Sequence, residues 1–427
     1  MTKHNLLNQW FWKWHVMAGL ITLPFMLLLA VTGSIYLFKD DVNNNIYQDI
    51  RFVEQPINAQ RLPLEEQLSS ARLISKAAVV GITLSSSPEQ ATAFQVAGKG
   101  WARNNLYVDP YTGEVKGEEN QKESLMYLVR KLHGELLLNQ VGTLVIELVA
   151  SWFIVLIITG LYIWWPNKGS GAAGFFTVRL SMGKRILFRD LHAVVGFWLS
   201  AFMLIILMGG MPWTDVFGSQ LKWVQKQTDA GYPTHWQNAK GLTSPLTDNQ
   251  ELTPLSLDEV VKITQSNNLD GVISIKFPSS AQGVFTIANR SLLLRDQHVI
   301  HINQYSGDTV KSLQWDDVGF LMDLRQVFMR LHQGEYGKAN WAVLLVVALS
   351  FIITTVAGLV SYLMRKPQGN WGVPTLPSGF NVDKLLLVLI IFLGGLFPMF
   401  GISLIIIFTW GKLKKLKFSN QPNTSNG

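Results

Sequence analysis

The sequence predicts a membrane α-helical bundle that carries two α+β modules outside the membrane. Of its 427 residues, 48% are apolar and 15% are charged, whereas soluble globular proteins have roughly 25% charged residues. The apolar residues gather in runs of more than 20, separated by two long polar stretches, 39–130 and 214–330. The motifs also recur in the same order in both halves of the chain, which indicates an internal parallel repeat.

Four apolar runs are long enough to cross the hydrocarbon core of a bilayer, which is about 30 Å thick. These runs are 17–38, 141–165, 193–213 and 341–364. The first is too long for the core of a signal peptide, so we expect it to be an uncleaved span. A fifth apolar segment, 385–410, is interrupted by Gly394, Gly395 and Pro398. It is compatible with a kinked fifth span and with a re-entrant hairpin.

Lysine and arginine residues orient these spans. Lys3 and Lys13 precede the first span, basic residues follow the second, and Arg365 and Lys366 follow the fourth. By the positive-inside rule these short segments are cytoplasmic, together with the N-terminus. The two long segments then lie on the outer side of the membrane, and the spans contact its lipid. The net charge of +7 therefore reflects topology and does not indicate a nucleic-acid partner.

The expected organisation alternates membrane segments with two modules. The membrane part has six segments. They are the N-terminal tail with the first span (1–38), the second span (131–165), a basic loop (166–190), the third span (191–213), the fourth span (331–366), and a hydrophobic segment with a basic tail (367–427). The modules are 39–130 and 214–330. In each module a helix, 64–78 or 256–266, precedes strands and a turn at Gly113 or Gly307, as in a small α+β module.

Four of the eight histidines occupy equivalent positions near the ends of the spans. Topology places His15 with His192 at the cytoplasmic edge, and His133 with His332 at the outer edge. Two imidazoles from repeat-related helices are what bis-histidine ligation of a b-type haem requires, so we predict two haems with these histidines as axial ligands of the iron. A single histidine at a helix end is more often interfacial, and the repeated register is what favours ligation.

The absence of cysteine restricts the remaining chemistry. With no cysteine in the chain, thiolate metal sites, iron–sulfur clusters and covalent c-type haem attachment are excluded. Arg130 and Arg189 each lie three residues before a candidate ligand, and on a helix they would share its face and reach a haem propionate. Snorkelling towards lipid headgroups is their alternative role. No catalytic residue can be named.

Two carboxylates are further candidates for a role at the site. Glu147 lies within the second span, where a carboxylate is unusual and would relay protons or bond to a neighbouring helix. Glu335 follows His332 by three residues, so we consider it a candidate active-site carboxylate beside the outer histidines.

Short motifs around these positions resemble a known family. The module ending Val-Asp-Pro-Tyr-Thr-Gly (108–113), the Leu-His-Gly before the second span (132–134), and the opening Trp-Lys-Trp-His (12–15) with Thr-Gly-Ser (32–34) carry the resemblance. They are similar to the PepSY-associated transmembrane helix family over residues 8–410. The resemblance implies that the two modules, 39–130 and 214–330, are PepSY-like and periplasmic, and that the protein lies in a bacterial inner membrane. The siderophore-iron reductase group of this family implies two bis-histidine haems, on His15, His192, His133 and His332, that pass electrons to a ferric siderophore in the periplasm.

The leading hypothesis is therefore a haem-dependent oxidoreductase that reduces a periplasmic ferric siderophore and releases Fe(II). We expect no fused flavodoxin-like or ferredoxin-reductase domain, so the electron donor, a cytoplasmic one or a quinol, is left open. Two alternatives remain. One is a PepSY-type membrane protein for binding or regulation without redox activity, and the other is a transporter, which the repeat suggests. The sequence names neither the chelate nor the oligomeric state.

Overall fold

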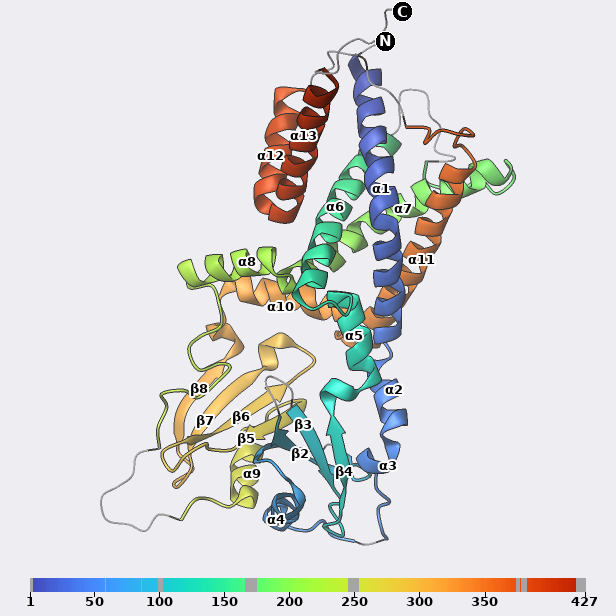
Figure 1. Cartoon of the computed structure of the whole chain (residues 1–427). Helices are drawn as coiled ribbons and strands as arrows, with labels where there is room; N and C mark the ends of the chain where they lie inside the picture. The colour runs from blue at the N-terminus through green and yellow to red at the C-terminus, as the bar shows by residue number, and fades with distance from the viewer. Residues whose placement is uncertain are drawn as a thin grey trace, which may run out of the picture. The chain divides into compact units, whose positions relative to one another are not determined.

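The computed structural model describes residues 3–57, 59–85, 87–98, 103–165, 175–244, 253–373, 377 and 382–419. Parts of the predicted basic loop and of the C-terminal tail lie outside these residues. The chain forms two compact units, which are described separately (Figure 1). The membrane unit comprises 1–34, 131–223 and 342–427, and the sheet unit comprises 35–130 and 224–341.

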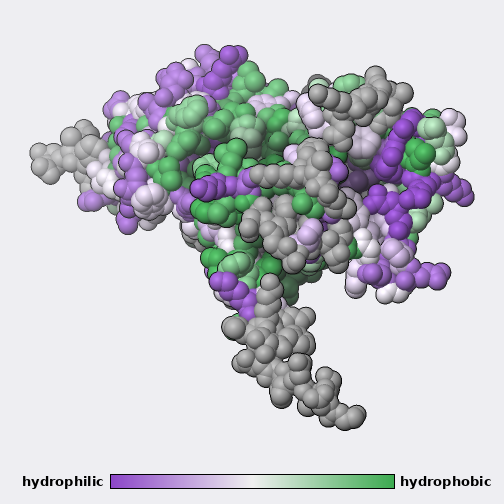
Figure 2. Space-filling view, turned by 90° about the horizontal axis from the view of Figure 1, so that it is seen from above, coloured by the Kyte–Doolittle hydropathy of each residue, from purple (hydrophilic) through white to green (hydrophobic). Residues whose placement is uncertain are grey.

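Four long apolar helices build most of the membrane unit. They are α1 (Lys3–Tyr36), α6 (Gln140–Trp164), α7 (Lys184–Gly210) and α11 (Gly337–Leu363). Each is long and apolar enough to cross a membrane, which confirms the four predicted spans. A helix satisfies its own backbone hydrogen bonds, so it can place an apolar surface against lipid. Apolar side chains remain exposed along these helices, and Figure 2 shows green hydrophobic areas on the molecular surface.

The C-terminal apolar segment forms a helical hairpin. Helices α12 (Lys384–Leu396) and α13 (Pro398–Ser419) lie side by side and are connected at Phe397 (Figure 1). Glycine permits their close approach, because a Cβ atom at Gly401 would meet the carbonyl oxygen of Gly394 at 2.5 Å. At about 1.5 Å per residue, α12 is only about 20 Å long and too short to cross alone. The segment thus folds back on itself at Phe397, whereas its re-entry into the membrane stays a prediction.

The sheet unit contains a single open antiparallel sheet of eight strands. The strands are β1 (Val79–Thr83), β2 (Thr92–Ala97), β3 (Arg103–Val108), β4 (Val115–Asn120), β5 (Val272–Lys276), β6 (Val284–Arg290), β7 (His298–Asn303) and β8 (Thr309–Gln314). Their order is β4-β3-β2-β1-β5-β6-β7-β8. The sequence predicted two modules, but β1 pairs with β5 and joins their strands. Each half thereby covers the unpaired edge of the other.

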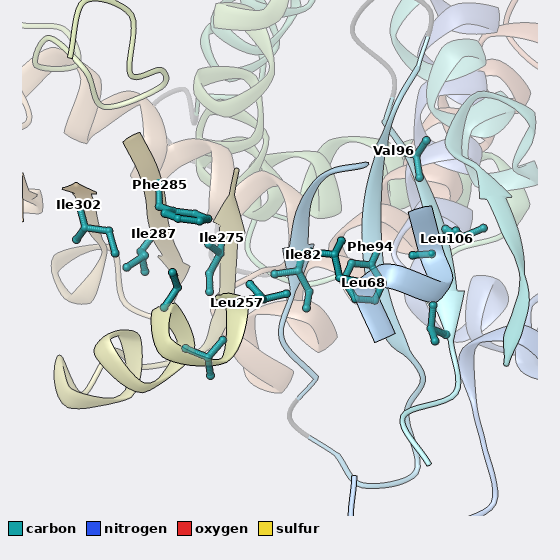
Figure 3. Close-up of a cluster of buried hydrophobic side chains, with 14 of the residues drawn as sticks. Leu68, Ile82, Phe94, Val96, Leu106, Leu257, Ile275, Phe285, Ile287 and Ile302 are labelled. Carbon is teal, nitrogen blue, oxygen red and sulfur yellow. The ribbon is translucent and has the colours of Figure 1, made fainter. Parts of the chain in front are cut away.

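One apolar core supports both halves of this sheet. Helices α4 (Leu64–Ile74) and α9 (Leu257–Ser266) pack against the same face. Ile82, Phe94 and Ile275 are completely buried. In Figure 3, Leu68 of α4 is drawn beside Phe94, and Leu257 of α9 beside Ile82 and Ile275. Alternate residues of a strand point to the same face, so β2, β3, β5, β6 and β7 each contribute side chains two residues apart to the core.

The N-termini of α4 and α9 cap each other across the two halves. The carboxylate of Asp258 in α9 accepts hydrogen bonds from the backbone N–H groups of Leu64 and Glu65, at 2.8 and 3.0 Å. In return, the Glu65 carboxylate accepts one from the N–H of Leu257 at 2.9 Å. Each carboxylate satisfies amides that a helix start leaves open and lies at the positive end of the helix dipole. These reciprocal caps connect the two halves of the sheet unit.

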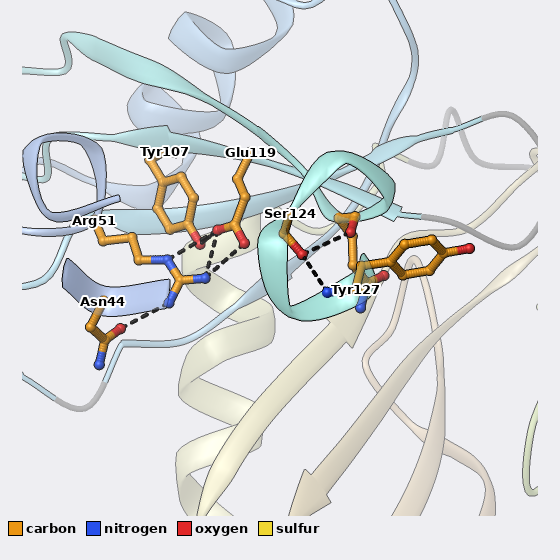
Figure 4. A network of polar contacts seen from close by, with 7 residues as sticks. Asn44, Arg51, Tyr107, Glu119, Ser124 and Tyr127 are labelled. Atoms are coloured by element: carbon orange, nitrogen blue, oxygen red, sulfur yellow. Dashed lines mark hydrogen bonds and ion pairs between the residues drawn. The ribbon is translucent and has the colours of Figure 1, made fainter. Parts of the chain in front are cut away.

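A buried ion pair ties the segment after α1 to the edge of the sheet. This segment forms α2 (Lys39–Ile46) and α3 (Gln48–Arg51). The Arg51 guanidinium donates to both carboxylate oxygens of Glu119 in β4, and the Tyr107 hydroxyl donates to the same carboxylate at 2.9 Å (Figure 4). Burial, with the adjacent Glu119 carboxylate, raises the pKa of Tyr107 to about 12. Tyr107 therefore stays protonated and acts as a donor at neutral pH.

We expect Asp258→Ala to destabilise the junction of the two halves by about 1 to 2 kcal/mol, because two amides of α4 lose their acceptor. Hydrogen–deuterium exchange of the solubilised full chain measures this effect, and amides at the start of α4 should exchange about tenfold faster. Glu66→Ala is the control, because it removes an exposed carboxylate from the first turn of α4. Equal protection in the two variants would contradict the reciprocal caps.

Candidate functional site

His15 of α1 and His192 of α7 face each other inside the membrane unit. Their ring centroids are 6.2 Å apart and the ring planes make an angle of 67°. Two imidazoles that share one metal ion, each with a nitrogen about 2 Å from it, have centroids about 6 to 6.5 Å apart. The two rings are therefore spaced for a single metal centre between them.

Neighbouring helices hold both rings through the Nδ1 atom. Nδ1 of His15 lies 2.9 Å from the hydroxyl of Thr159 in α6, and Nδ1 of His192 lies 3.0 Å from the carbonyl oxygen of Thr354 in α11. A metal-binding histidine usually uses one nitrogen for the metal and the other for such a fixing bond. With Nδ1 occupied in this way, Nε2 is the atom that can bind a metal.

The two histidines line a cavity of about 440 Å³ between α1, α6, α7 and α11. This volume lies within the range of about 300 to 1,000 Å³ that is usual for cofactor sites. Most of the lining is apolar and includes Leu23, Met26, Phe153, Leu156, Met203 and Phe351. Such a lining excludes water and suits a large, flat and mainly hydrophobic group.

Two glycines make room for the imidazoles. A Cβ atom at Gly160 would lie 3.1 Å from Cε1 of His15, and one at Gly358 would lie 2.6 Å from Nδ1 of His192. Both glycines line the cavity. Sequence reasoning missed them, although each follows a threonine-containing stretch near the C-terminal end of its span. The fit of the rings thus depends on residues that have no side chain.

Two arginines line the same cavity, Arg189 and Arg365. The Arg189 guanidinium donates to the fully buried carboxylate of Asp190 at 2.7 Å and lies 5.9 Å from the ring of Trp164. Arg365 lies 5.3 Å from the ring of Trp12. Arg189 was predicted from its spacing to His192, whereas Arg365 was missed. Its position directly after the fourth span was the available signal.

Arg130, the other predicted propionate partner, lies in α5 (Leu125–Glu135). Its guanidinium stacks over the ring of Tyr127, one turn earlier in the same helix, at 4.9 Å from the centroid. Arg130 precedes His133 in this helix, as the sequence spacing predicted. Its role at a haem stays a prediction.

His133, near the end of α5, is held in the same way as His15. Its Nδ1 atom lies 3.0 Å from the hydroxyl of Thr32 in α1, and a Cβ atom at Gly33 would lie 3.3 Å from its Cε1. α5 does not continue into α6, because residues 136–139 form a turn in which Leu136, Leu137 and Asn139 have positive φ. The turn separates His133 from the axis of the second span.

His332 lies in the last turn of α10 (Phe320–Gln333), which ends at the left-handed Gly334. It belongs to the sheet unit, whereas His133 belongs to the membrane unit, and their pairing stays a prediction. Glu335, the candidate active-site carboxylate, accepts from Lys39 at 3.1 Å and from Arg290 at 2.7 Å. Burial raises the pKa of Glu335, but these two cations together bring it below its usual value. The carboxylate is thus engaged in a structural ion pair.

Glu147 has a structural role in the membrane unit. Its buried carboxylate accepts hydrogen bonds from the backbone N–H groups of Val216 and Phe217, at 2.8 and 2.9 Å. These residues begin α8 (Val216–Gln227), so Glu147 caps that helix. The sequence suggested either a proton relay or a bond to a neighbouring helix for Glu147, and the structure shows the bond to a neighbouring helix.

The histidines of β7 show a different pattern. His301 is buried, and both its nitrogens are bonded, Nδ1 to the Thr286 hydroxyl and Nε2 to the His235 carbonyl, each at 3.0 Å. Among the residues that the structure describes, no three His, Cys, Asp or Glu side chains group into a metal site. The membrane cavity is the better candidate for a cofactor.

The family model of the PepSY-associated TM region matches residues 12–365. The chain belongs to this family. The match includes the four candidate histidines and all the cavity-lining residues up to Arg365, and it ends before the α12–α13 hairpin. No curated protein matches the chain. Family membership establishes a membrane protein of the PepSY-associated type.

We expect Gly358→Ala to impair cofactor binding in this PepSY-associated protein, because the new methyl group would displace the His192 imidazole. With the predicted haem as the cofactor, the purified variant should retain several-fold less haem per chain than the unchanged protein. Gly19→Ala is the matched control, since Gly19 lines the same cavity but its nearest atom, Cδ2 of Leu156, would be 3.9 Å away. Size-exclusion profiles check that both variants fold. Equal haem content would show that the glycine is not needed.

Proposed function

We propose that the protein is a membrane oxidoreductase with two b-type haems that reduces a ferric siderophore in the periplasm with electrons from the cytoplasm. The observation that carries this proposal is the 6.2 Å spacing of the His15 and His192 rings at an apolar cavity. Neither of the alternatives, a binding protein or a transporter, requires two imidazoles at a metal-sharing distance inside lipid. Two buried imidazoles without a ligand for their second nitrogen would only add a cost of desolvation.

Different residues of the cavity would hold different parts of the cofactor. A haem would supply a one-electron carrier within the membrane. His15 and His192 would bind its iron from α1 and α7 through Nε2, and the apolar lining would keep water from it. Arg189 and Arg365 are the cations of the lining, so they would bind the propionates by charge-assisted hydrogen bonds.

A second site is needed to carry electrons to the outer side of the membrane. We assign it to His133 and His332, which the positive-inside rule places at the outer edge. The hydrogen bond with Thr32 and the close approach of Gly33 give His133 the same surroundings as His15 has at Thr159 and Gly160. This similarity supports His133 as a ligand.

The resemblance to siderophore-iron reductases supports the choice of acceptor. One electron from a cytoplasmic donor or a quinol reduces one Fe(III) to Fe(II) at the outer site, and hard oxygen ligands hold Fe(II) far more weakly. The metal is thereby released outside, and the chelate does not have to cross the bilayer. The two halves of the sheet unit are the proposed docking region for this bulky substrate.

We expect two haems per chain, since each histidine pair holds one. A pyridine haemochromogen assay against protein concentration measures this ratio, and the oxidised spectrum should be low-spin. A ratio near one would contradict the outer pair, and colourless protein with intact helices would reject the whole proposal.

The acceptor is tested with protein reconstituted in liposomes and reduced by dithionite. A membrane-impermeant ferric siderophore should reoxidise the haems, and an external chelator should trap Fe(II) outside. Iron-free siderophore is the control. If both haems are present and reduced but persist in the reduced state, siderophore reduction is rejected, while electron transfer to another acceptor stands.

A further inference from the structure

Two threonine hydroxyls in the membrane unit make bonds whose direction can be deduced. Thr159 Oγ1 lies 2.8 Å from the carbonyl oxygen of Val155, one turn earlier in α6, and Thr32 Oγ1 lies 2.7 Å from that of Leu28 in α1. A carbonyl can only accept, and a hydroxyl has one hydrogen to donate. Each hydroxyl hydrogen is therefore already used within its own helix.

In its contact with a histidine, each threonine hydroxyl must then be the acceptor and the imidazole the donor. Thr159 accepts a hydrogen bond from Nδ1–H of His15 at 2.9 Å, and Thr32 accepts one from Nδ1–H of His133 at 3.0 Å. A neutral imidazole carries a single N–H, so its lone pair must be on Nε2. His192 reaches the same tautomer, because its Nδ1 faces the carbonyl oxygen of Thr354.

We propose that Thr159 and Thr32 are positioning residues that fix His15 and His133 in the tautomer able to bind iron through Nε2. This inference rests on the proposed function, because it concerns the ligands of the two haems. Each threonine is followed directly by the glycine that the imidazole contacts, Gly160 or Gly33.

His301 shows that a threonine beside a histidine does not by itself give this result. Its Nε2 faces the carbonyl oxygen of His235 and must carry the hydrogen, so its Nδ1 accepts from the hydroxyl of Thr286. The tautomer is the opposite one, and Nε2 is occupied. The second bond of the threonine, to its own helix, is what makes Thr159 and Thr32 acceptors.

An acceptor at Nδ1 also makes the imidazole a more electron-rich ligand, and loss of such a partner typically costs 10- to 100-fold in metal affinity or activity. Removing the hydroxyl should therefore weaken the preference for the ferric state and raise the midpoint potential of the haem. A tenfold change in this preference corresponds to about 59 mV for a one-electron couple.

The test compares Thr159→Val, Thr159→Ser and a control, Thr355→Val. Thr355 lines the same cavity, but its hydroxyl donates to the Phe351 carbonyl of its own helix at 2.8 Å. Haem content and spectroelectrochemical midpoint potentials are measured for each purified protein. We expect Thr159→Val either to lose one haem or to raise the midpoint potential of that haem by about 59 mV, which corresponds to a tenfold weaker preference for the ferric state. Thr159→Ser and Thr355→Val should resemble the unchanged protein.

The same change at Thr32 should affect the other haem. Thr32→Val provides the test independently if Thr159→Val does not fold. The inference is overturned if both valine variants match Thr355→Val in haem content and in both potentials. If the unchanged protein contains no haem, the proposed function fails instead, so the two failures are distinguishable.

Discussion

The membrane unit depends on one constraint, which is that two imidazole rings, those of His15 and His192, lie in its apolar interior with the Nδ1 atom of each held by a neighbouring helix. A polar group at this depth is costly unless it is bonded. Thr159 and the carbonyl of Thr354 supply the fixing bonds. The resulting ring spacing of 6.2 Å is the distance that one metal ion would bridge. The rest of the unit is arranged around this requirement.

Helix packing follows from the same constraint. Gly160 and Gly358 bring backbone close to the rings, as small residues commonly do where membrane helices approach each other. The remaining space between α1, α6, α7 and α11 is a cavity and not a packed core, although close packing is the rule for protein interiors. A cofactor that fills this space would also contribute to the stability of the bundle.

Much of this organisation was predictable because it depends on local sequence. Apolar length gave the four spans, and turn glycines gave the turns at Gly113 and Gly307, which both have positive φ. The features that could not be predicted depend on contacts between distant residues. The pairing of β1 with β5 makes one sheet from two predicted modules, and the turn at 136–139 separates α5 from α6. The roles of Thr159 and Gly160 become visible only when α6 is placed against His15.

The central claim is that His15 and His192 bind the same haem, and single alanine variants of the two test it most directly. Each variant is purified, and its haem content and redox-resolved absorption spectra are compared with those of the unchanged protein. His298→Ala, in β7 of the sheet unit, is the control. The account predicts that both variants lose the same spectral component and midpoint potential and retain the other. Loss of different haems in the two variants, or full haem content in either, would contradict it.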